Sequence, residues 1–363
     1  MTLRLTFTLS QRADLGRPVE IQGSVTAAHQ LTGQPETAML EDMGQRSSSL
    51  GSLAHRPLNM LAAAAAVGVL IAGVLYATDP RELLGVSLWE KPLKFLLSSV
   101  IYALTLSWFY SFTARSRRFG WWLGVSIVAF LVIELIIIVG AASLGVTSHF
   151  NVSSPLAIAL WSTMATAISL TWGATFLMGA LLWKSSLIPR VLRDAIRWGI
   201  GIALGGMGIA FAMTPPQANQ IADWQGIAGA HAVGVADGGP GLPFLGWSTV
   251  AGDLRISHFF GLHALQIVPA VAALGMLFLS SVAAQRALVH ASGVALSLVV
   301  IILFVQALSA ESIVSPSATT LTLLAAAAVV SVAVGCIAAW LHYRRYGHDL
   351  PSEKPASPVD QAA

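Results

Sequence analysis

Eight stretches of this sequence are apolar over a length that can cross a membrane. A bilayer core about 30 Å thick needs roughly 20 consecutive apolar residues in a helix. The stretches run over residues 59–77, 92–113, 120–146, 155–183, 196–213, 257–283, 289–310 and 318–343. They predict an all-α fold, a polytopic transmembrane helical bundle of about eight spans.

The composition excludes several other classes of protein. Only 10% of the residues are charged, 55% are hydrophobic, and the mean hydropathy is +0.73. A soluble domain has about 25% charged residues, so a water-soluble enzyme is excluded. The single cysteine, Cys336, excludes a disulfide-stabilised secreted domain. No basic stripe with interleaved aromatics is present, so the expected partner is the lipid bilayer and not a nucleic acid.

The fifth stretch is short and unusually rich in glycine. Glycines spaced three or four residues apart let helix backbones approach closely in a membrane. We therefore expect a tightly packed span there and not a loop. The glycines are Gly199, Gly201, Gly205, Gly206 and Gly208.

The distribution of positive charge predicts the orientation. If both termini are cytoplasmic, 16 of the 20 Lys and Arg residues fall on the cytoplasmic side and 4 on the other. Cytoplasmic loops carry an excess of Lys and Arg, which favours this orientation. The expected location is the inner (plasma) membrane of a bacterial cell.

The regions outside the spans are predicted from their polarity. Residues 1–55 and 347–363 are polar and lack sustained periodicity, so we expect disordered cytoplasmic tails around a transmembrane domain at 56–346. The long outer loop at 214–256 is rich in glycine, alanine and proline, and loops of this length are typically functional lids or disordered segments.

Glu134 lies near the middle of the third stretch. A carboxylate costs several kcal/mol at the centre of a membrane unless it is paired or faces a cavity. Two alternatives follow. Glu134 is either a protonated acid hydrogen-bonded to a neighbouring helix, or a relay for protons or cations.

The other unusual polar groups gather towards the outer ends of the spans, which predicts a site that opens outward. The candidate catalytic residues are Glu134, His149 and His263, and the candidate metal ligands are His149, His258 and His263. The candidate ligand-binding residues are Lys91, Lys94, Asn151, Asp253, Arg255, Gln266 and Gln306.

A short internal sequence repeat favours successive helical hairpins around one outward-facing cavity. Ser148-His149-Phe150 stands before the fourth span and Ser257-His258-Phe259 opens the sixth. Both precede outside-to-inside helices, so His149 and His263 are expected to come near each other. His258 and His263 are five residues apart and do not share a helix face.

Three functions remain open. A transporter or small-molecule binder would use Glu134 as its coupling carboxylate, and Lys91, Lys94 and Arg255 to meet a small anionic ligand or lipid headgroup. A redox protein would bind haem b, or a quinone, between histidines of facing helices. A hydrolase would bind a divalent metal among the outer acids and histidines, with His231 and Asp237 as further candidates.

Three segments add a loose resemblance. Residues 89–95, 148–151 and 246–266 resemble segments of bacterial multi-pass membrane proteins of unassigned function. The resemblance implies this class of protein and no site residue.

Overall fold

The computed structural model describes residues 55–346, except 114–115 and 184, and the expected tails at 1–54 and 347–363 lie outside the described residues. Eight described helices are long and apolar enough to cross a membrane. They are α3 (Arg56–Thr78), α4 (Glu90–Tyr110), α5 (Arg117–Ser143), α6 (Pro155–Leu182), α7 (Arg190–Ile209), α9 (Leu254–Phe278), α10 (Val282–Leu308) and α11 (Ala318–Tyr346). The predicted helical bundle is confirmed, and the chain is a multi-pass integral membrane protein.

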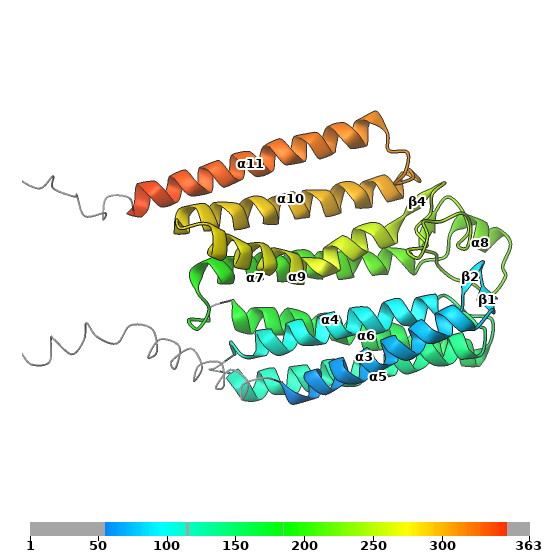
Figure 1. The fold of residues 1–363 in the computed structure, drawn as a ribbon. Coiled ribbons are helices and arrows are strands. Elements are labelled where there is room, and N and C mark those ends of the chain that lie inside the picture. The colour runs from blue at the N-terminus through cyan, green and yellow to red at the C-terminus, as the bar shows by residue number, and fades with distance from the viewer. Residues whose placement is uncertain (1–54, 114–115, 184, 347–363) are drawn as a thin grey trace, which may run out of the picture. The chain divides into compact units, whose positions relative to one another are not determined.

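The spanning helices pack chiefly as successive hairpins (Figure 1). Helix α3 packs against α4, α5 against α6, α7 against α9, and α10 against α11. Helix α6 also packs against α7 and so connects the first four helices with the last four. The remaining elements are short: η2 (Ala210–Met213), α8 (Ala218–Ala222), and two antiparallel pairs, β1 (Glu82–Leu83) with β2 (Val86–Ser87) and β3 (Ala232–Val233) with β4 (Gly252–Asp253).

Several helices begin earlier than hydropathy predicts. Helix α7 starts at Arg190 instead of residue 196, and α10 starts at Val282 instead of 289. Polar first turns remain helical because the backbone still needs its hydrogen bonds where it enters the bilayer. Other starts follow capping rules, since Ser154 Oγ accepts the Ala157 amide just before Pro155.

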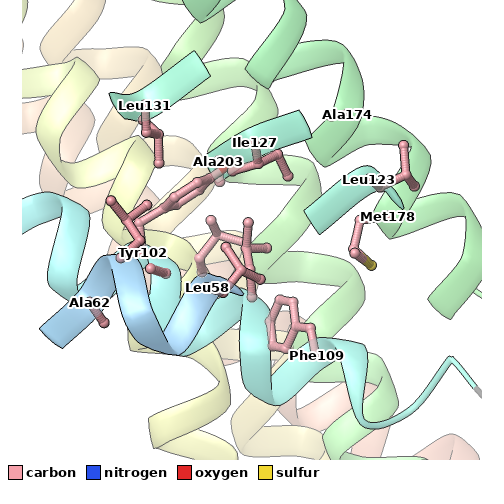
Figure 2. Close-up of a cluster of buried hydrophobic side chains, with 14 of the residues drawn as sticks. Leu58, Ala62, Tyr102, Phe109, Leu123, Ile127, Leu131, Ala174, Met178 and Ala203 are labelled. Atoms are coloured by element: carbon pink, nitrogen blue, oxygen red, sulfur yellow. The ribbon is translucent and has the colours of Figure 1, made fainter. Parts of the chain in front are cut away.

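One apolar cluster lies among the first four spanning helices and α7 (Figure 2), and a second lies among α7, α9 and α10. Leu58 of α3, Phe109 of α4 and Ile127 of α5 point into the same interior region, together with Met178 of α6 (Figure 2). Many large apolar side chains on the outer faces of the helices are exposed, which is the pattern that lipid contact requires.

His55 is a difference from the prediction. The sequence predicts that it belongs to the N-terminal tail, but it is fully buried. It caps α3, because its Nδ1 accepts the Leu58 amide. Burial lowers the pKa of His55. Its ring also packs edge-on against Tyr110, with ring centroids 4.9 Å apart.

The glycines of α7 support the predicted close packing at two positions. A Cβ added to Gly206 would lie 2.5 Å from the Gly261 Cα on α9, and one added to Gly199 would lie 2.8 Å from the Ala264 carbonyl oxygen. A Cβ at Gly205 would meet nothing within 4 Å. Helix α9 therefore approaches α7 closely on the face that carries Gly199 and Gly206.

Candidate functional site

One end of the bundle carries the loop at 144–154 and the long loop at 214–253, beside the β1–β2 hairpin (Figure 1). We call it the long-loop end. It is the end predicted to face outward. Most of the predicted site residues gather here or on the adjoining helix turns.

Lys94 and Arg255 fix the long loop to the helices. The Lys94 ammonium donates to Glu90 Oε1 at 2.7 Å and to the carbonyl oxygens of Phe244 and Leu245 at 2.9 and 3.3 Å. Arg255 donates to the Gly246 carbonyl oxygen and to the carboxylate of Asp253. Both cations therefore have internal acceptors, and their geometry fits an anchoring role for the loop.

Asp253 is fully buried and orders the start of α9. Its carboxylate accepts the backbone amides of Ser248 and Arg255 at 2.8 and 3.0 Å, besides its ion pair with Arg255. A carboxylate with this many donors is well satisfied without any external ligand.

Two more predicted ligand-binding residues stabilise loops. Asn151 Oδ1 accepts the amide and the hydroxyl of Ser153 at 3.1 and 2.7 Å. Gln306 Nε2 donates to Glu311 and to the Ser312 carbonyl oxygen at the turn between α10 and α11. Asn151 Oδ1 and Gln306 Nε2 therefore have local partners.

Glu134 and His149 lie together beneath the loops of this end. His149 Nε2 lies 3.7 Å from Glu134 Oε1, and Ser148 Oγ lies 3.0 Å from His149 Nδ1. When Ser148 donates to Nδ1, the proton of the neutral imidazole is on Nε2 and faces Glu134. The other carboxyl oxygen of Glu134, Oε2, is buried and has no hydrogen-bond partner among the described residues.

Lys91 completes this group, which we call the acid–base cluster (Lys91, Glu134 and His149). Its ammonium interacts electrostatically with Glu134 and His149 and lies 5.9 Å from the ring centroid of Phe95. Within the described residues, Lys91 forms no ion pair within 4 Å and donates no hydrogen bond to a protein acceptor. It differs in this from Lys94, one helical turn away.

Aromatic rings surround His149. Its ring centroid lies 5.7 Å from that of Phe95, 5.2 Å from Trp161 and 6.1 Å from Phe150. Burial, with smaller effects from Lys91 and His231, holds the pKa of His149 well below its usual range. His149 is therefore neutral near pH 7.

The long loop adds a histidine and a carboxylate that the charge pattern only suggested as metal ligands. His231 Nδ1 lies 2.6 Å from Asp237 Oδ2, and the His231 ring packs against Phe150 with centroids 4.9 Å apart. Burial lowers the pKa of His231 against the opposing effect of Asp237. Despite its burial, Asp237 has a pKa held below the usual range by His231 and by backbone amides.

The histidines of α9 form a separate group. His258 Nδ1 lies 2.7 Å from the Gly206 carbonyl oxygen, while His263 packs on Phe259 with centroids 4.4 Å apart. Helix α9 begins at Leu254, so His258 lies inside a helix whereas His149 lies in a loop. The two copies of the short sequence repeat are thus not structurally equivalent.

Gln266 lies one turn beyond His263. Its Nε2 donates to Thr105 Oγ1 of α4 at 2.9 Å. Its side chain also interacts with His263 on the same face of α9. No hydrogen bond, ion pair or ring contact joins His149 to His263 in the described part of the chain.

The predicted metal ligands are not assembled. Across residues 55–346 outside the gaps, no group of three or more His, Cys, Asp or Glu side chains has the arrangement to hold a metal ion. The geometry therefore gives no support to the set His149, His258 and His263 as a metal centre.

Comparisons with protein-family models, with curated proteins and with solved structures find no match. We therefore infer the chemistry of the site from its geometry. Among the described residues, the acid–base cluster offers a cation without a protein acceptor, a carboxyl oxygen without a donor and a neutral imidazole between aromatic rings. Such a set can bind a small anion and exchange a proton.

Proposed function

We propose that this protein is a membrane transporter or binding protein for a small anion, and that protonation of Glu134 is coupled to binding. The ligand would approach from the long-loop end and pair with Lys91. Glu134 and His149 would take up or release the accompanying proton.

The main support for this proposal is the burial of Glu134 inside a membrane-spanning helix. The carboxyl group lies nine residues from the end of α5, about 14 Å along the helix axis, and is buried, with one oxygen that has no partner among the described residues. An ionisable group at such depth costs several kcal/mol, and groups of this kind typically mark ion, proton or substrate pathways.

Lys91 supports an anionic ligand because no described residue provides an acceptor for its ammonium. Lys94 and Arg255, the other two predicted anion contacts, are held by carbonyl oxygens and carboxylates. An ammonium with all three protons available binds an anion strongly where neighbouring apolar rings reduce the dielectric.

The test is proton movement in proteoliposomes that contain the purified protein and an internal pH-sensitive dye. Phosphate or lactate is added outside, and protein-free liposomes correct for passive entry. We expect anion-dependent acidification with the wild type, and its loss with Lys91→Gln and with Glu134→Gln.

The matched control is Glu82→Gln, which removes an exposed carboxylate at the same end. It should leave the acidification unchanged. Equal proton movement in wild type, Lys91→Gln and Glu134→Gln would contradict the proposal, as would a wild type that acidifies no faster than protein-free liposomes with either anion.

A further inference from the structure

The Asp237–His231 pair has the geometry of an oriented base. The Asp237 carboxylate accepts the backbone amides of His231 and Ala232 at 3.0 and 2.9 Å. The same carboxylate accepts the imidazole Nδ1–H at 2.6 Å. Three donors thus fix the carboxylate, and the carboxylate fixes the ring.

This arrangement determines the tautomer of His231. Because Nδ1 donates to Asp237, the lone pair of the neutral ring is on Nε2. No hydrogen bond to Nε2 is formed by the described residues. The backbone holds the residue in place as well, since the His231 carbonyl oxygen accepts the Leu254 amide at 3.0 Å.

His231 is a neighbour of the acid–base cluster in the long loop. It interacts electrostatically with His149 and Lys91, and Phe150 contacts the rings of both His149 and His231. The exposed fraction of the side chain falls from 22% at His231 to 16% at His149 and 6% at Glu134. The three proton-accepting groups therefore form a series of increasing burial.

We propose that His231 is the residue through which the acid–base cluster exchanges protons with the aqueous phase, and that Asp237 is its positioning residue. The inference rests on the proposed function and adds the route of the proton. A proton taken up at Nε2 gives an imidazolium whose Nδ1–H stays on Asp237. Its release towards His149, directly or through water, restores neutral His231. His149 takes up that proton at Nδ1 and releases its Nε2 proton to the ionised Glu134, which restores a neutral imidazole at His149.

The charged and titratable groups around His231 set the direction of its pH response. Asp237 of the same loop favours the protonated ring, while Lys91 of α4 and Arg255 of α9 oppose it. His149 before α6 and His258 of α9 also interact with His231. Removing the Asp237 charge should therefore lower the pKa of His231 and move the pH profile of proton uptake to lower pH.

The first measurement is the rate of internal acidification across pH 5 to 8 in the same proteoliposomes. We expect His231→Gln to slow proton uptake at least tenfold and to flatten the profile. Asp237→Asn should shift the profile to lower pH without abolishing uptake. Asp223→Asn, which removes an exposed carboxylate from the same loop, is the control and should match the wild type.

The outcomes separate this inference from the proposed function. A wild-type rate and profile in His231→Gln, with uptake abolished in Glu134→Gln, would overturn the role of His231 and leave the proposed function intact. If Glu134→Gln also behaves as wild type, the proposed function itself fails.

A second measurement needs no variant and so does not depend on folding of the mutant. Diethyl pyrocarbonate modifies neutral imidazole nitrogens, and mass spectrometry identifies the modified residues in sealed proteoliposomes. His231 should react faster than His149 and His258. Protection of His231 while His149 reacts would contradict a route that enters through His231.

Discussion

Nε2 of His149 lies 3.7 Å from Oε1 of Glu134, so a loop residue reaches a carboxyl group that is nine residues inside a membrane-spanning helix. The contact is longer than a hydrogen bond, and Glu134 Oε2 has no partner within the described chain. This relationship makes Glu134 the residue whose substitution discriminates best between a structural and a functional acid.

Two substitutions of Glu134 distinguish a functional acid from a structural one. Glu134→Gln keeps the shape but cannot ionise, so we expect normal folding and loss of anion-dependent proton movement. Glu134→Leu removes an unsatisfied polar group from the interior, and the thermal stability in detergent should be equal or higher by about 1 kcal/mol. If the residue only donates a structural hydrogen bond, Leu should instead be destabilising and Gln nearly silent. A Gln variant with unchanged function at every pH would end the proton-exchange role.

The sequence predicts the fold well because hydropathy alone identifies eight spans. It misplaces helix starts such as Arg190 because polar turns at a membrane interface have no apolar signal. Glu134 and Lys91 could also be selected from the sequence, since the cost of burying a charge is large.

Other parts of the site depend on loop conformation. The carbonyl oxygens that accept hydrogen bonds from Lys94 and Arg255 belong to residues 244–246. Backbone acceptors cannot be predicted from a pattern of side chains. The Asp237–His231 pair likewise depends on the path of the loop backbone over the six positions that separate the two residues. A His followed at this spacing by an Asp in a glycine-rich loop is a weak signal until this path is known.

The pH dependence of stability should reflect His149. Burial holds its pKa well below the value of about 6.5 expected in the unfolded chain, so the native state binds fewer protons. Its contribution to stability is present above pH 6.5 and is lost as the pH falls towards the folded-state pKa. We expect the wild type to lose about 1 kcal/mol per pH unit from this residue in that range.

Thermal unfolding in detergent between pH 7.5 and 5 measures this effect. His149→Gln should have a shallower dependence, although His55 and His231 have pKa values shifted in the same direction and will retain part of it. An identical slope in the wild type and in His149→Gln would show that His149 does not have the lowered pKa.

Two glycines of α7 provide a matched pair for the packing of α7 on α9. Gly206→Ala places a Cβ 2.5 Å from the Gly261 Cα, so the helices must separate, and we expect a loss of about 1–3 kcal/mol. Gly205→Ala meets nothing within 4 Å and should stabilise the helix by about 0.5 kcal/mol. Thermal unfolding of both variants checks the difference, and equal effects would contradict the close approach.

Asp194 links α7 to α10 at the end opposite the long loop. Its Oδ2 lies 2.8 Å from an Arg286 nitrogen and 3.6 Å from His290 Nε2, and Trp198 donates to His290 Nδ1. Asp194→Asn should cost about 1–3 kcal/mol because it removes the negative charge that pairs with Arg286 and leaves a single acceptor oxygen. Arg197→Gln is the comparison: its contact with Asp194 is 3.6 Å long and partly exposed, and it also donates to the Trp183 carbonyl oxygen at an exposed position, so it should cost less than Asp194→Asn, about 1 kcal/mol. Unfolding midpoints in detergent compare the two, and a larger loss for Arg197→Gln would reverse the assignment.

The orientation of the bundle decides which compartment supplies the ligand. Sixteen of the 20 Lys and Arg residues fall on one side when both termini are placed in the cytoplasm, whereas the long-loop end has four. A reporter fused after Ala363 should therefore be active in the cytoplasm, and a tag inserted within residues 238–243 should be accessible from outside intact cells. The insertion lies in the long loop, outside the spanning helices, where Gly238 has a φ of +94°. A cytoplasmic signal from the 238–243 tag would reverse the orientation and make the acid–base cluster accessible from the cytoplasm.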